Sequence, residues 1–244
     1  MSPFIAELIG TMLLILMGNG VVANVLLSKS KGNGGGWLLI NFGWGMAVFI
    51  GVLVAGPYSG AHLNPAVTIS LAIAGKFAWD LVALYILAQM LGAALGAFLV
   101  WLSYKDHYYQ TDNVAAKKGT FCNTPAIDNT LSNLMTEIIA TFVLVFSVLY
   151  LVSPEFNANV IANETVGLGS IGALPVALIV TAIGMSLGGP TGYAINPARD
   201  LAPRIMHAIL PMGKKGDSGW SYSWIPVVGP ILGGAVAAGL YLAL

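Results

Sequence analysis

The sequence has few charged residues, few histidines and almost no cysteine. Only 8% of its 244 residues are Asp, Glu, Lys or Arg, whereas a soluble domain carries roughly a quarter. Ten basic and ten acidic residues balance, so charge gives no reason to expect nucleic acid or a strongly acidic partner. One cysteine excludes a disulfide framework, and three histidines show no ligand spacing. We therefore expect no metal and no other cofactor.

Apolar residues make up 57% of the chain instead. Crossing about 30 Å of hydrocarbon takes around 20 mostly apolar residues in a helix. Six stretches meet this requirement: 4–27, 37–56, 79–104, 131–152, 171–187 and 224–244. The first contains Glu7 and has no basic segment before it, so we interpret it as a retained span rather than a signal peptide. The sequence predicts an all-α membrane protein with six transmembrane helices.

Two further apolar segments, 65–75 and 197–210, are too short to span a bilayer. Each begins at the proline of an Asn-Pro pair, which predicts two re-entrant half-helices. The segment 59–68 aligns with 191–200 at an offset of 132, and Glu7 has its counterpart in Glu137 at an offset of 130. We predict one channel domain built from a first repeat (1–104), a connector (105–130) and a second repeat (131–244). Because each repeat has three spans, an odd number, the repeats are inverted and share a site near the midplane.

Asn64 and Asn196 each precede a proline, the order expected of an N-cap followed by the first helical residue. The side-chain oxygen then accepts backbone N–H groups, and the amide NH₂ remains a donor. Where the N-termini (tips) of two such half-helices meet, their amide donors and the positive ends of their helix dipoles converge. This arrangement favours a lone-pair oxygen, opposes a cation and interrupts a proton wire.

Charges inside a membrane are expensive and point to function. Arg199 follows Asn196 by three residues and offers its donors to a permeant hydroxyl. Glu7 and Glu137 are candidates for a proton relay, but one per repeat favours a structural role, in which they accept backbone N–H groups of an irregular loop. Asp200 lies in the first turn of its half-helix, where the dipole favours a carboxylate.

The doubled Asn-Pro-Ala motif followed by Arg199 resembles the signature of the major intrinsic protein family, the aquaporins and aquaglyceroporins. The motif residues are Asn64, Pro65, Ala66, Asn196, Pro197 and Ala198. The resemblance covers nearly the whole chain and implies the aquaporin fold, a homotetramer, a plasma-membrane location and cytoplasmic termini. It also implies a carbonyl ladder from Gly60, Ala61, His62, Leu63, Tyr193, Ala194 and Ile195.

By the same resemblance, Trp44, Gly184, Tyr193 and Arg199 form the selectivity filter. Water-selective members typically have Phe and His at the first two positions, so Trp44 and Gly184 resemble the glycerol-conducting branch. We expect Gly184 to widen the pore, and Trp44 with Tyr193 to form an aromatic corner opposite Arg199, which suits an amphipathic solute. Glycerol facilitators often have Phe where this chain has Tyr193, which leaves the direction of its phenol open.

The sequence therefore predicts a passive channel for glycerol, water and other small uncharged solutes. Dihydroxyacetone, urea, hydrogen peroxide and undissociated lactic acid are further candidates. A stricter water channel and an ion-coupled secondary transporter are the alternatives; no nucleophile, base and oxyanion set indicates an enzyme. The implied orientation places most lysines outside, against the positive-inside rule. Labelling Cys122 with an impermeant thiol reagent is expected to decide the orientation.

Overall fold

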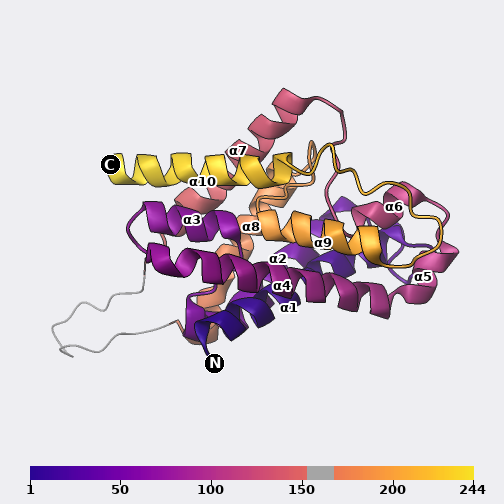
Figure 1. Ribbon diagram of the computed structural model, residues 1–244, viewed down its shortest axis with the longest axis horizontal. Helices are drawn as coiled ribbons and strands as arrows, with labels where there is room; N and C mark the ends of the chain where they lie inside the picture. Colours follow the sequence, from indigo (N-terminus) through magenta and orange to yellow (C-terminus); the bar gives the residue numbers. More distant parts are fainter. Residues whose placement is uncertain (153–167) are drawn as a thin grey trace.

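The computed structural model describes residues 1–152 and 168–244, and the regular secondary structure of these residues is helical, with no strand among them (Figure 1). Six helical stretches of these residues are long and apolar enough to cross a membrane. The first half contains α1 (Pro3–Leu26), α2 (Gly36–Ser59), the short α3 (Pro65–Ile73) and α4 (Trp79–Ser103). The second contains α7 (Thr130–Leu149), a turn η1 (Gly169–Ala173) leading into α8 (Leu174–Leu187), the short α9 (Pro197–Ile209) and α10 (Ile225–Ala243). The predicted fold class is confirmed.

The two halves interlock through their short helices. α1 packs on α2 and α4, and α7 packs on α10, whereas α3 packs on α10 and α9 packs on α4. Figure 1 shows α3 beside α10, with α9 and α4 adjacent to each other. Glycines allow the close contacts, because a Cβ on Gly92 would collide with Leu8 O and one on Gly233 with Ile138 O. Each short helix is therefore held by the opposite half of the chain.

The connector between the halves is more ordered and more buried than its polar composition indicates. It forms α5 (Lys105–Gln110) and α6 (Val114–Gly119), and the side chains of Tyr108 and Phe121 are fully buried. Lys117 Nζ donates hydrogen bonds to Met212 O (3.0 Å) and Lys214 O (2.9 Å) in the loop after α9. These bonds fasten the connector to the second repeat.

Cys122 lies in this connector and is only 1% exposed. Burial raises the pKa of its thiol to about 12, and the thiolate is the reactive form. Cys122 is therefore a poor target for an impermeant reagent, contrary to the expectation that its labelling would report the orientation.

Candidate functional site

Two asparagines cap the half-helices and join their tips. Asn64 Oδ1 accepts the N–H of Ala66 at 2.9 Å, and Asn196 Oδ1 accepts those of Ala198 (3.0 Å) and Arg199 (3.2 Å). Each amide also reaches across to the other repeat: Asn64 Nδ2 donates to Ile195 O at 2.8 Å, and Asn196 Nδ2 donates to Leu63 O at 2.9 Å. One amide hydrogen of each asparagine is thus used between the tips, which leaves one for a further acceptor.

The loops that lead into the tips have the same unusual backbone in both repeats. Ala61 and Leu63 have φ of 51°, and their counterparts Tyr193 and Ile195 have φ of 39° and 45°. Left-handed backbone is unfavourable for residues with a Cβ, most of all for a β-branched one such as Ile195. Such conformations persist only where the surrounding structure holds them.

Glu7 holds the first loop. Its Oε1 accepts from Ser59 Oγ (2.7 Å) and the His62 N–H (2.9 Å), while its Oε2 accepts from the Leu63 N–H (2.7 Å) and Gln89 Nε2 (2.8 Å). The carboxylate is fully buried. Every donor around it points at the charge, so it stabilises the strained backbone.

Glu137 holds the second loop in the same way. Its Oε1 accepts from Thr191 Oγ1 (2.6 Å) and the Ala194 N–H (2.9 Å), and its Oε2 accepts from the Ile195 N–H (2.9 Å). The sequence reading missed the two hydroxyl donors, Ser59 and Thr191. Their matched position directly before Gly60 and Gly192 was the available signal.

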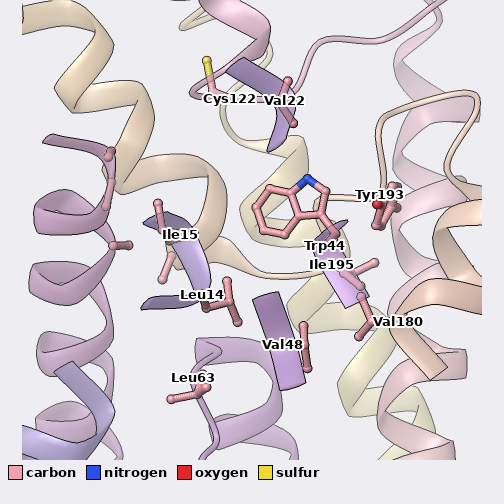
Figure 2. Packing of buried hydrophobic residues seen from close by; sticks show 14 of the residues in the cluster. Leu14, Ile15, Val22, Trp44, Val48, Leu63, Cys122, Val180, Tyr193 and Ile195 are labelled. Carbon is pink, nitrogen blue, oxygen red and sulfur yellow. The ribbon is translucent and has the colours of Figure 1, made fainter. Parts of the chain in front are cut away.

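Three side chains lie where two cavities meet, one at the half-helix tips and the other toward the connector. A cavity of about 260 Å³ runs past Asn64 and Asn196, and one of about 220 Å³ lies toward the connector; Trp44, Tyr193 and Arg199 line both. The Arg199 guanidinium carbon lies 4.3 Å from the centroid of the Trp44 ring, a cation–π contact. One guanidinium nitrogen of Arg199, Nη1, has no hydrogen-bond partner among the described residues. Figure 2 shows Trp44 and Tyr193 at one level, with Val48 and Val180 below them.

Gly184 lies behind this ring of side chains and lines neither cavity. A Cβ on Gly184 would stand 2.6 Å from Tyr193 Cζ and 2.9 Å from its Oη, closer than real contacts allow. The absence of a side chain therefore makes room for the Tyr193 ring, so Gly184 would act on the width of the pore through the position of Tyr193 and not as a lining residue. Tyr193 is buried, and its ring also meets Trp37 edge-on, with centroids 5.9 Å apart.

A buried ion pair anchors the second half-helix. Arg204 Nη2 lies 2.7 Å from Asp200 Oδ1, and both side chains are fully buried. Arg204 also donates to three backbone carbonyls: those of Asn123 (2.8 Å), Ser218 (2.6 Å) and Gly219 (2.9 Å). Asp200 Oδ2 accepts the Asn123 N–H at 2.7 Å. The sequence reading missed Arg204, although its place four residues after Asp200 on a helix was a signal.

These features define a class: a multi-pass membrane protein in which two capped half-helices meet tip to tip and line a cavity inside a bundle of spans. The family model described as Major intrinsic protein matches residues 1–241, and the chain belongs to this family. This is a family of passive channels, so the protein is not an enzyme.

Known relatives match almost the whole chain. It is 53% identical over 241 residues to the probable glycerol uptake facilitator protein of Thermotoga maritima, covering 99% of this chain and 98% of the relative. It is 50% identical over 241 residues to the glycerol uptake facilitator protein of Bacillus subtilis, covering 99% and 84%. The solved structure of the aquaglyceroporin from Plasmodium falciparum superposes with a TM-score of 0.82 at 32% identity, covering 98% and 93%.

Proposed function

We propose that this protein is a passive channel for glycerol, water and other small uncharged solutes. The observation that carries the proposal is the meeting of two cavities at Trp44, Tyr193 and Arg199. Two aromatic rings offer an apolar wall, and the Arg199 side chain, which lines both cavities, offers guanidinium donors. Glycerol has a carbon backbone with hydroxyls along it, so it satisfies both surfaces at once. The relatives named as glycerol uptake facilitators support the same solute.

The solute then passes the half-helix tips. Asn64 and Asn196 each keep one amide hydrogen for a hydroxyl oxygen, and the N-termini of α3 and α9 oppose cations. The larger cavity is lined on this stretch by Gly60, Ala61, His62, Leu63, Tyr193, Ala194 and Ile195. We assign their carbonyls as acceptors for hydroxyls that slide past. Pro65, Ala66, Pro197 and Ala198 shape the first turns of the two half-helices.

A passive mechanism is favoured over an ion-coupled one. Glu7 and Glu137 are the acidic side chains that a coupling-ion site would use, and each is already surrounded by backbone and side-chain donors. Glu7 accepts four hydrogen bonds and Glu137 three, of the roughly four that a carboxylate can accept. Both side chains are fully buried and line neither cavity. We assign both residues, with Asp200, to structural support.

We further propose a homotetramer in the plasma membrane with cytoplasmic termini, as the family resemblance implies. A better reporter of orientation than Cys122 is an introduced cysteine at the exposed Asp112. In a Cys122→Ser background, Asp112→Cys is expected to react with an impermeant thiol reagent on intact cells. Labelling only after permeabilisation would reverse the orientation.

The test of function is stopped-flow light scattering on proteoliposomes, measuring glycerol and water permeability. The native protein is expected to pass both well above empty liposomes. Gly184→Ala should lower glycerol permeability more than water permeability, because its Cβ displaces the Tyr193 ring. Gly189→Ala is the matched control, since nothing lies within 4 Å of the added methyl group.

Two outcomes would count against this assignment. Fast water flux with glycerol flux equal to empty vesicles would make the protein a stricter water channel. Glycerol accumulation driven uphill by a proton or sodium gradient would make it a coupled transporter.

A further inference from the structure

The inverted repeat gives each position of the proposed filter an equivalent on the other side of the half-helix tips. α2 and α8 cross at equivalent residues, because a Cβ on Gly45 would stand 3.2 Å from the carbonyl oxygen of Ala177, the residue 132 positions later. The pseudo-two-fold axis that relates the repeats therefore passes close to this crossing. Residues equivalent to those on the connector side of the tips lie on the side away from the connector.

The four equivalent residues all line the larger cavity, which also runs past the tips. At the offset of 132, Trp44 corresponds to Val176, Gly184 to Val52, Tyr193 to Ala61 and Arg199 to Val67. The backbone is equivalent as well, since φ is 51° at Ala61 and 39° at Tyr193. We name Val52, Ala61, Val67 and Val176 the second ring.

The second ring differs from the proposed filter in its chemistry. Its four side chains contain no nitrogen or oxygen, whereas the proposed filter brings an indole, a phenol and a guanidinium together. Beyond the second ring the cavity is lined by further aliphatic side chains, those of Leu71, Val148 and Leu151. The smaller cavity, by contrast, has polar side chains in its lining: Asn123, Thr124 and Thr191. A solute beyond the tips therefore meets mostly aliphatic side chains.

The polar groups beside the second ring belong to one loop and are acceptors. Gly60, Ala61 and His62 line the cavity there, and their carbonyls accept hydrogen bonds. His62 Nδ1 lies 3.2 Å from Thr68 Oγ1, whose own hydrogen is donated to Asn64 O at 3.0 Å. Nδ1 therefore carries the proton of a neutral His62 ring, which makes Nε2 an acceptor too. One side of this stretch accepts hydrogen bonds, and the other side is apolar.

We propose that the second ring determines specificity, favouring small neutral solutes with one apolar end, such as short-chain diols, over solutes that are polar at both ends. A hydroxyl directed at the second ring loses its hydrogen bonds with water and finds no replacement among these four side chains. A methyl group in the same place loses none and leaves water favourably. The inference rests on the proposed passive channel and adds a second selecting position to it.

Two solutes isolate this effect. Glycerol and 1,2-propanediol have the same carbon backbone, but one terminal CH₂OH of glycerol is a methyl group in 1,2-propanediol. Both cross the same proposed filter, so a substitution in the second ring that changes the ratio of their permeabilities reports on the second ring. The rates of empty liposomes are subtracted for each solute, because the less polar diol crosses lipid faster.

The test variant carries Val52→Thr and Val176→Thr, each of which exchanges a methyl group for a hydroxyl of similar size. The ratio of 1,2-propanediol to glycerol permeability in proteoliposomes should fall by about two- to tenfold, because the new hydroxyls supply a hydrogen-bond partner to the third hydroxyl of glycerol. Val236→Thr, at an exposed position of α10, is the matched control and should leave the ratio unchanged. A variant with Val52→Ala and Val176→Ala widens the second ring without adding a polar group and should not lower the ratio.

An unchanged ratio in the threonine variant would overturn the role of the second ring. An equal fall in the alanine variant would overturn it as well, because width and not polarity would then be the cause. If the double threonine variant does not give folded protein, Val52→Thr alone replaces it, and the ratio should fall in the same direction.

Failure of the second ring and failure of the channel are distinguishable in the same measurements. A native protein that passes neither solute faster than empty liposomes would refute the channel itself. A native protein that passes both, with a ratio that the threonine variant does not change, would refute only the second ring.

Discussion

The two half-helices have the same residues at their N-terminal tips but differ in the residues that follow. Both begin with Asn-Pro-Ala, both are preceded by left-handed residues at matched positions, and each loop is held by one buried glutamate. At the offset of 132, however, Arg199 and Arg204 in α9 correspond to Val67 and Ala72 in α3. The repeated part builds the backbone around the midplane, and the unrepeated part places charge on one side only.

The supporting networks differ accordingly. Beside α3, Gln89 Nε2 bridges Glu7 and the hydroxyl of Thr68, at 2.8 and 2.9 Å. Beside α9, the position equivalent to Thr68 is Asp200, which pairs with Arg204. A network of a carboxylate, an amide and a hydroxyl supports one half-helix, and a buried ion pair supports the other.

The largest expected effect comes from the ion pair that has no equivalent in the first repeat. Arg204→Ala leaves Asp200 buried without its counter-charge and removes the bonds to Asn123, Ser218 and Gly219. We expect a loss of about 3–5 kcal/mol in the free energy of unfolding. Chemical or thermal unfolding in detergent measures it. Lys214→Ala, on an exposed side chain nearby, should change stability by less than about 0.5 kcal/mol.

An Arg204→Ala variant as stable as the native protein would show that the pair is dispensable. The half-helices would then be more alike in their support than their sequences indicate.

The second prediction concerns the two glutamates, which the repeat makes equivalent. In Glu137→Gln, the new side-chain NH₂ group faces backbone N–H donors and has no acceptor there. The substitution should therefore lower the free energy of unfolding by about 1.5–3 kcal/mol. Glu7→Gln should cost less, because a half-turn of the Gln89 side-chain amide exchanges Nε2, which now donates to Glu7, for Oε1, which has no partner among the described residues and would accept from the new amide. Parallel unfolding measurements on the two variants test this order. Equal losses, or a greater loss at position 7, would refute the role of Gln89.

The smallest expected effect concerns the caps. Asn196 Oδ1 accepts two backbone N–H groups and Asn64 Oδ1 accepts one, so Asn196→Ala should destabilise more, with each loss about 1 kcal/mol. Asn113→Ala is a matched control, because Asn113 also caps two N–H groups but lies at the exposed start of α6. Its loss should be the smallest of the three. A control as costly as Asn196→Ala would mean that the contact between the tips adds nothing.

Much of the architecture could be read from the sequence because its signals are local. Apolar length predicts the spans, Asn-Pro marks the start of a half-helix, and a repeated ten-residue segment indicates inverted halves. The structure has these elements, with ends displaced by a few residues. Residues 153–167, which follow the predicted fourth span and belong to the predicted second repeat, lie outside the described residues.

What could not be read depends on contacts between distant segments. Nothing local in the connector distinguishes the buried Cys122 from a surface thiol; it is covered by residues almost a hundred positions further on, such as Ser218.

The sequence by itself thus determined the number of spans, the two capped half-helices, their pseudo-symmetry and the types of residue at the proposed filter. Only the tertiary structure decided that the two amides reach across to the opposite loops, that Gly184 accommodates the ring of Tyr193, and that Arg204 ties α9 to two loops. The physical reason is the distance along the chain between the residues that interact. Helix formation and burial follow from neighbours along the chain, whereas hydrogen bonds and steric fit between repeats exist only after the halves have packed together.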